Sequence, residues 1–369
     1  MEPYTYEFTA IRGVQAGTAY YVAMCPLKLI PRLFRFDDET LPADLRAQRL
    51  LNRARVPAIA RYIADNPKEY ILSSLCASVD GDLDFEPLAG DGPLRSVGRL
   101  RIAMTATILI NDGQHRRAAI EEALRDRPYL GDETISVVVF ADRGLLRSQQ
   151  MFADLNIHAV KPTKSIGVLY DHRDPMSRLV RRVVSAVPLF RDFTEREKTT
   201  ISNRSLKLFT LSAIYQATAE FIGKPKGADL TQADEEHSVR FWNAVAKAMP
   251  DWQSVAQRRI AAADLRRDYV HAHGIALQAI AIAGAQLVAL YPEAWDTRLE
   301  ALRQLDWSRS NVDLWEGRAL IGGRVNKART NVILVSNIIL QHFGLPLTTE
   351  GERLERMHTC DASEVMVNA

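Results

Sequence analysis

TATILINDGQHRRAAIE, residues 105–121, places a strand pattern and a helix pattern in close succession. Thr107 to Ile110 is a short run of apolar, mostly β-branched residues, which is typical of a strand. Asn111, Asp112 and Gly113 are strong turn formers and end that run. From Gln114 onward apolar residues recur at helical spacing. The stretch therefore predicts a strand, a tight turn and a helix.

The first turn of this predicted helix carries His115, Arg116 and Arg117. The first N–H groups of a helix have no partner within it, and the helix dipole adds positive potential there. Acidic residues are preferred at such a position, so these side chains run against the rule. A bound anion resolves the conflict, and a phosphate group fits best. In a plain turn the arginines would instead face solvent, and the motif alone leaves both interpretations open.

The overall composition is that of a soluble globular protein. The 369 residues are 47% hydrophobic and 25% charged, and they suffice for one large or two ordinary domains. Lys and Arg number 47 against 45 Asp and Glu, so the net charge is only +2. No global basic field attracts nucleic acid, and any such contact must come from local basic patches.

Three further features bear on location. The 3 cysteines lie far apart without metal-ligand spacing, and an odd number makes a poor disulfide framework. MEPYTYEFTA has acidic and aromatic residues where a signal peptide needs a basic start and an apolar core. The apolar run from Gly274 to Tyr291 contains two glutamines and is too short to span a membrane. We therefore expect a cytoplasmic protein without a membrane role.

Strand and helix patterns alternate in the first 170 residues. Strands are expected at 4–12, 18–26, 70–77, 83–85, 99–104, 107–110 and 135–140. Helical patterns occur at 42–66, where Pro57 would kink or divide the helix, from Gln114 to about 127, and at 145–156. This alternation predicts an α/β or α+β domain over residues 1–170.

Strand patterns almost vanish beyond residue 170. Helical patterns occur at 175–187, 203–222, 235–249, 251–264, 272–290 and 331–343. We expect a mainly helical domain over residues 171–350 and a polar tail over residues 351–369.

The common catalytic signatures do not occur in the sequence. It contains no P-loop, no G-x-G-x-x-G run, no nucleophile elbow and no H-x-x-x-H pair. His271 and His273 form an H-x-H pair, but side chains two residues apart on a helix point to different faces. We therefore expect no structural metal and, if a nucleotide binds, a different phosphate cradle.

Basic side chains outside the motif gather after the helical pattern that ends near residue 156, in pairs within the helical half, and in the loop LIGGRVNKARTN at 320–331. Flexible, cationic chain that can approach closely suits the DNA backbone. The residues assigned to DNA contact are Lys161, Lys164, Arg181, Arg182, Arg324, Lys327 and Arg329. A helix cap with solvated lysines and a solvated loop stay open as alternatives.

The chain resembles the DndB family of DNA sulfur modification proteins. Asn111 to Arg116 contains the DGQHR signature, and similar segments follow one another along most of the sequence. They are AIRGVQAGTAYYVAM (10–24), RAQRLLNRARVPAIARYI (46–63), SVDGDLDFEPL (78–88), FADLNIHAVKP (152–162), SNRSLKLFTLSAI (202–214), DWSRSN (306–311) and WEGRALIGGRVNKARTNV (315–332). Ordered matches of this extent are more specific than five residues alone.

The resemblance implies a cytoplasmic bacterial protein tied to DNA phosphorothioation. It would be a DNA-binding negative regulator of the modification genes, with their operator as a double-stranded DNA partner and other phosphorothioation proteins as further partners. The DGQHR segment is similar in turn to the core motif of the ParB and sulfiredoxin superfamily. This implies an α+β protein, with a ParB/sulfiredoxin-like mixed-sheet domain followed by a mainly helical domain. Its oligomeric state stays open.

In that superfamily the strand-turn-helix motif holds nucleotide phosphate. Carried over, Gly113 permits a tight approach by ATP or another nucleotide, and the N–H groups of Gln114 and His115 face the phosphate. Arg116, with Arg117 beside it, supplies charge. Sulfiredoxins have a reactive cysteine where this sequence has Gln114, so their peroxidic sulfur chemistry is excluded here.

An enzymatic alternative uses the same motif. Asp112 would orient water or a divalent metal ion, His115 would act as acid or base near neutral pH, and Arg116 would stabilise charge on a phosphate. The protein would then be a nucleoside triphosphatase or a DNA-nicking enzyme. Regulation and catalysis are compatible, because nucleotide binding could switch DNA affinity. A scaffold for other modification proteins, without catalysis, is a third hypothesis.

Overall fold

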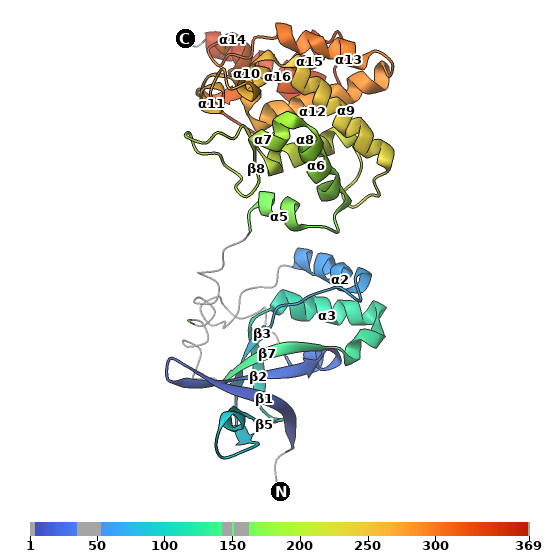
Figure 1. Cartoon of the computed structure of the whole chain (residues 1–369). Coiled ribbons are helices and arrows are strands. Elements are labelled where there is room, and N and C mark those ends of the chain that lie inside the picture. Colours follow the sequence, from blue (N-terminus) through green and yellow to red (C-terminus); the bar gives the residue numbers. More distant parts are fainter. Residues whose placement is uncertain (1–3, 35–52, 142–149, 151–161, 368–369) are drawn as a thin grey trace. The chain divides into compact units, whose positions relative to one another are not determined.

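The computed structural model describes residues 4–34, 53–141, 150 and 162–367. The chain divides into two compact units, Met1–Val160 and Lys161–Ala369, which are considered separately (Figure 1). The first contains a mixed sheet and the second is almost entirely helical, so the predicted α+β class is confirmed. Residues 164–170, expected with the sheet domain, fold in the helical unit.

The first unit is built on a sheet whose strand order is β4-β5-β1-β2-β7-β3-β6. Neighbouring strands are antiparallel, except that β3 and β7 run parallel. Its elements are β1 (Thr5–Gln15), β2 (Thr18–Pro26), η1 (Leu27–Leu29), α1 (Ile30–Leu33), η3 (Arg53–Arg55), α2 (Val56–Asp65), β3 (Leu75–Asp80), β4 (Leu83–Pro87), η4 (Pro93–Ser96), β5 (Val97–Ala103), β6 (Thr107–Asp112), α3 (Gln114–Asp126), η5 (Pro128–Asp132) and β7 (Thr134–Ala141).

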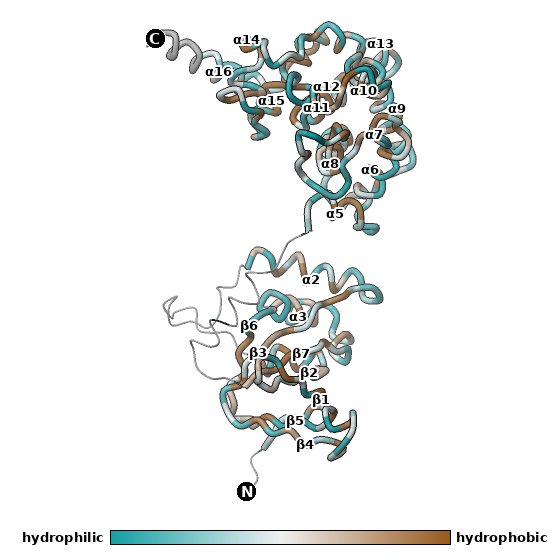
Figure 2. The backbone as a smooth tube through the Cα atoms, turned by 60° about the vertical axis from the view of Figure 1, so that its left-hand side comes forward, coloured by the Kyte–Doolittle hydropathy of each residue, from teal (hydrophilic) through white to brown (hydrophobic). Residues whose placement is uncertain are grey.

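Local sequence accounts for most of this unit. Ala16 and Gly17, both with positive φ, make the two-residue turn of the predicted β1–β2 hairpin, and such turns match the twist of the strands. α2 and α3 pack against each other on one side of the sheet (Figures 1 and 2). Buried apolar side chains of both helices belong to the same core cluster as those of the strands. The helix expected at 42–66 is described only from Arg53 onward, as η3 and α2. Pro57 does not kink α2, because it lies in the first helical turn, where no intrahelical N–H bond is lost. The predicted helix at 145–156 falls outside the described residues, apart from residue 150.

The second unit consists of helices with two short two-stranded pairings, β8 with β9 and β10 with β11, in its described part. Its elements are α5 (Lys164–Tyr170), α6 (Pro175–Ala186), α7 (Pro188–Phe193), β8 (Thr194–Glu195), β9 (Phe209–Thr210), α8 (Leu211–Ile222), α9 (Gln232–Ala248), α10 (Pro250–Ala256), α11 (Ala262–Asp268), η6 (Val270–Ala272), α12 (Gly274–Leu290), α13 (Trp295–Arg298), η7 (Leu299–Gln304), α14 (Val312–Trp315), β10 (Leu320–Ile321), β11 (Arg324–Val325), α15 (Arg329–His342) and α16 (Thr349–Val367). Two expectations are corrected: residues 203–210 precede α8 without joining it, and 251–264 spans two helices.

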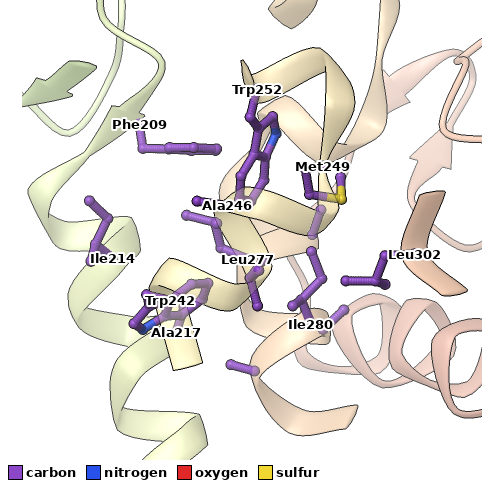
Figure 3. Close-up of a cluster of buried hydrophobic side chains, with 14 of the residues drawn as sticks. Phe209, Ile214, Ala217, Trp242, Ala246, Met249, Trp252, Leu277, Ile280 and Leu302 are labelled. Carbon is purple, nitrogen blue, oxygen red and sulfur yellow. The ribbon is translucent and has the colours of Figure 1, made fainter. Parts of the chain in front are cut away.

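α12 is the central helix of the second unit. Its Ile275, Leu277 and Ile280 side chains are fully buried, and α8 and α15 pack along it. Figure 3 shows Leu277 and Ile280 among side chains that include Trp242 of α9. Gly274 and the three residues after it are all buried, so packing holds the amino end of α12 in place. No helix in the described part of the chain is long and apolar enough to cross a membrane.

The carboxyl-terminal segment is a helix, α16, where the sequence predicted a polar tail. Arg318 and Glu355 form an ion pair that is largely shielded from solvent, and Asn337 Nδ2 donates to Glu355 Oε2 at 2.9 Å. Leu354 packs on α15 beside these groups. α16 is mainly polar, so its docking depends on tertiary contacts that periodicity does not reveal.

We predict that Glu355→Ala destabilises the second unit by about 3 kcal/mol, since it leaves the Arg318 charge buried without its partner. Burial alone would raise the pKa of Glu355, but hydrogen bonds from Arg318 and Asn337 hold that pKa below its usual value. The contribution is therefore present above the unfolded-state pKa and is lost as pH falls through the folded-state pKa. Urea denaturation at several pH values measures it, with the exposed Glu352→Ala as control. Equal stability of the two variants at neutral pH contradicts the docking role.

Candidate functional site

The DGQHR turn lies at an edge of the sheet, where β6 ends and α3 begins. The register between β3 and β6 shifts there, because Cys76 pairs with Asp112 while Ala77 pairs with Ile110. Asn111 is the extra residue of this bulge, and its Nδ2 donates to Ser78 Oγ in the interior. Bulges of this kind re-aim side chains next to functional sites. Asp112 consequently points to the partly exposed side, with 43% of its side chain accessible.

Gly113 is the residue that allows the chain to enter α3. Its φ is +106°, a conformation that side chains disfavour. A Cβ at this position would lie 2.4 Å from Leu75 Cδ2 and 3.0 Å from Arg116 Nη2. The guanidinium of Arg116 therefore rests directly against the glycine. The glycine of the motif serves the turn itself, independently of any ligand.

The polar side chains of the motif are tied into the unit. Arg116 Nη2 donates to Asp112 Oδ2 at 2.9 Å and to the Ser74 carbonyl at 3.0 Å. Gln114 is buried, and its Nε2 donates to two carbonyls at the end of β6. Arg117 donates to two carbonyls in and after α1 and pairs with Glu121. The motif thus brings Asp112 and Arg116 together, while Gln114 and Arg117 brace the turn from within.

Cys76 lies beside the motif, a neighbour that the sequence reading missed. It is buried and is the strand partner of Asp112. Burial and the nearby Asp112 charge raise the pKa of Cys76 to about 12. The thiol is therefore protonated at neutral pH and is a poor nucleophile. Strand pairing across β3 and β6 is the signal that could have revealed this neighbour.

The residues assigned to DNA contact are dispersed, and Lys161 lies outside the described residues. Lys164 begins α5 and Arg182 lies on α6, both exposed. Arg181 points inward instead and donates to three backbone carbonyls at the end of α5. Arg329 begins α15 and pairs with a glutamate of α8. These positions form no common cluster with one another in the contacts of the structure.

The late basic loop folds as a small hairpin of β10 and β11. Gly322 and Gly323 make its turn with φ values of +56° and +69°. Their N–H groups donate to the carboxylate of Glu316, so these amides already have an anionic partner. Arg324 follows the turn and is exposed. Contact with a phosphate at this hairpin would therefore come from side chains.

Arg324 and Lys327 line one open hollow of about 600 Å³, together with His273, Ile321, Val325 and Asn326. We call the depression lined by these residues the hairpin hollow. Arg309, which the sequence reading missed, fixes the hairpin by donating from Nη2 to the Gly323 carbonyl at 2.7 Å. The hairpin hollow is thus lined by Arg324 and Lys327 of the predicted loop together with His273, which lies between η6 and α12.

The two histidines of the H-x-H pair make separate contacts. His271 is fully buried, with Nε2 2.9 Å from Asp251 Oδ2, and its Nδ1 accepts from Trp252 at 3.2 Å. His273 Nε2 lies 2.8 Å from the Arg266 carbonyl. Their divergence agrees with the expectation from residue spacing, and only His273 reaches the hairpin hollow.

We predict that Gly113→Ala destabilises the first unit by about 3 kcal/mol, because the new methyl group meets both a strained backbone and the Leu75 and Arg116 side chains. Gly92→Ala is the matched control, since Gly92 also has positive φ (+72°) but open space around it. Chemical denaturation followed by circular dichroism compares the two. An equal loss in both variants contradicts the close packing on Gly113.

Residues 8–346 match the DndB family, described as DNA-sulfur modification-associated. No curated protein and no solved structure matches the chain. The family match covers the DGQHR turn and the hairpin hollow and confirms the resemblance seen in the sequence, whereas the likeness to ParB and sulfiredoxin stays a prediction. The chain belongs to the DndB family of DNA-sulfur modification-associated proteins.

Proposed function

We propose that this protein binds double-stranded DNA through the helical unit and acts as a negative regulator of DNA sulfur modification genes. The observation that carries the proposal is the hairpin hollow, where Arg324 and Lys327 are exposed side by side in one surface depression. Membership of a family associated with DNA sulfur modification makes nucleic acid the relevant anion. Other modification proteins are further candidate partners.

The chemistry of the hairpin hollow suits the DNA backbone. Among the residues that the structure describes, its lining includes two cations and no acidic side chain. Cationic side chains that contact phosphates release condensed counterions, which supplies binding free energy independent of base sequence. Arg309 holds the hairpin in place from beneath, so Arg324 is presented on a fixed turn. The hollow is thus suited to positioning DNA, while base recognition needs other residues.

We predict that Arg324→Ala weakens binding to a duplex containing the modification-gene promoter by about tenfold at low salt and lowers the salt slope by about 1. Fluorescence anisotropy at several salt concentrations measures both quantities. A scrambled duplex should lose affinity equally, because the contact is to backbone.

The exposed Lys226→Ala, in the loop between α8 and α9, is the control for general loss of positive charge. Unchanged affinity and salt slope in Arg324→Ala would refute the proposed contact. An equal loss of affinity in Lys226→Ala would also refute the proposed contact.

We propose as a second function that the DGQHR turn is catalytic. It would bind the phosphate of ATP or another nucleotide and hydrolyse that nucleotide, or it would nick DNA. The observation that favours this is the Asp112–Arg116 pair, which is partly exposed beside the amino end of α3. Asp112 would orient water or a divalent metal ion, and His115 would transfer a proton. Arg116 would exchange its bond to Asp112 for a phosphate oxygen, with Gly113, Gln114 and Arg117 maintaining the turn.

We predict that the double variant His115→Ala/Arg116→Ala abolishes ATP hydrolysis or plasmid nicking by the full chain. Phosphate release and the conversion of supercoiled plasmid are the measurements. Arg125→Ala, which removes an exposed arginine from the same helix, should retain wild-type rates. If the wild type shows neither activity, or the double variant keeps it, the DGQHR turn is not catalytic.

A further inference from the structure

A cavity of about 520 Å³ lies at the amino end of α12. This α12 cavity is separate in its lining from the DGQHR turn, and it shares only His273 and Lys327 with the hairpin hollow. Its volume lies within the range of small-molecule sites, roughly 300–1,000 Å³. The DNA contact proposed above needs only the hairpin hollow, so this second, partly open cavity is unexplained by it.

The lining of the α12 cavity divides into a cationic part, an apolar part and a set of uncharged polar side chains, which are Thr199, Thr200, Asn203 and Thr210. Arg266, Arg309 and Lys327 supply the positive charge, and Arg267 lies at the edge, already paired with Asp264 and Asp268. No acidic residue lines the cavity within the described part of the chain. Apolar surface comes from the segment before α8, including Leu208 and Phe209. A ligand with one anionic group and one apolar group matches this division.

Backbone carbonyls hold Arg266 and Arg309 in place, and Arg309 also lies close enough to the Asp268 carboxylate to help lower the pKa of Asp268. Arg266 donates to three backbone carbonyls of the loop that precedes β9. Arg309 donates to the carbonyls of Arg267 and Gly323 at 3.0 and 2.7 Å. Carbonyl groups fix a guanidinium but leave its full charge. Arg266 and Arg309 therefore form a rigid positive field around the cavity.

Lys327 is the cation that is free to contact a ligand. It makes no hydrogen bond or ion pair with the residues that the structure describes. Its Nζ lies 3.4 Å from the position that a Cβ on Gly274 would occupy, directly at the first residue of α12. The 17-residue helix adds its positive dipole end at this point, and Gly274 is one of the residues that line the cavity. The positive charge of Lys327 and the positive end of the α12 dipole therefore lie at the same place.

The pKa of His273 is lowered by its surroundings at this cavity. Burial lowers the pKa of His273 to about 4, and the charges of Arg309, Lys327 and Arg266 also act to lower it. Lys327 is exposed as a whole residue, but desolvation of its ammonium group lowers the pKa of Lys327 as well. A bound anion would counteract both pKa shifts, because it favours the charged forms.

We propose that the α12 cavity binds a small molecule carrying a phosphate group, with the phosphate between Lys327 and the amino end of α12 and the apolar part toward Phe209. Arg266 and Arg309 stabilise the anion through their fixed charge. The site is distinct from the DGQHR turn and from the DNA contact of Arg324. It gives the helical unit a place for a soluble ligand next to its proposed DNA surface.

The test uses the full chain, with inorganic phosphate and adenosine monophosphate as probes in isothermal titration calorimetry. We expect saturable 1:1 binding, and about tenfold weaker binding in Lys327→Met, a loss of about 1.4 kcal/mol. Lys327→Arg should stay close to wild type, because it keeps the charge. Lys226→Met is the matched control and should bind as wild type does. The NMR titration of His273 should move to higher pH when the ligand is bound.

Arg324→Met separates this site from the DNA contact, since it should keep affinity for the small probes while losing affinity for duplex DNA. Absence of saturable binding of both probes overturns the proposal, whatever the DNA result. Unchanged affinity in Lys327→Met overturns it too. If only duplex DNA binds and Lys327→Met impairs that binding, the cations serve the DNA backbone and the cavity is not a small-molecule site.

Discussion

Positive charges that form no ion pair with a carboxylate, within the described residues, surround the amino end of α12. Arg266, Arg309 and Lys327 repel one another, and their approach is tolerated because the fold around them is rigid. Ten of the 17 residues of α12 are buried, and this packing holds its amino end in place. The packing of the helical unit therefore keeps these like charges close together, and a bound anion would offset their repulsion.

The DGQHR turn contrasts with this arrangement. Arg116 and Arg117 already donate to Asp112, Glu121 and backbone carbonyls. These contacts hold the strand-turn-helix together, so much of the signature has a structural role. Gly113 is required by its φ and by the side chains packed on it. A phosphate there would have to replace the Asp112–Arg116 bond, whereas one at α12 would replace nothing. On these grounds the helical unit is the better-prepared anion site.

Local patterns predicted the sheet unit well. The β1–β2 hairpin, β6, the turn at Gly113 and α3 follow from residue type and spacing over a few positions. α16 escaped prediction because its polar sequence gains its place through Arg318, Asn337 and Leu354. The family resemblance supplied the link to DNA sulfur modification, which no periodicity contains.

The cationic surfaces could be predicted only in part. Arg324 and Lys327 stood out because they lie in one basic loop, but Arg266 and Arg309 come from other segments and line the same cavity as Lys327 only in the folded chain. A single sequence carries no signal for such proximity. Arg181 illustrates the opposite error, since a basic pair on a helix suggested DNA contact while one member caps a neighbouring helix.

Hydrogen–deuterium exchange of the full chain, with and without saturating promoter duplex, tests the central claim that the helical unit carries the DNA contact. We expect slower exchange on DNA binding in the backbone of residues 320–329 and of residues 266–275, with residues 111–117 unchanged. Protection confined to residues 111–117, with none around the hairpin, would contradict the account and return the nucleic-acid contact to the DGQHR turn.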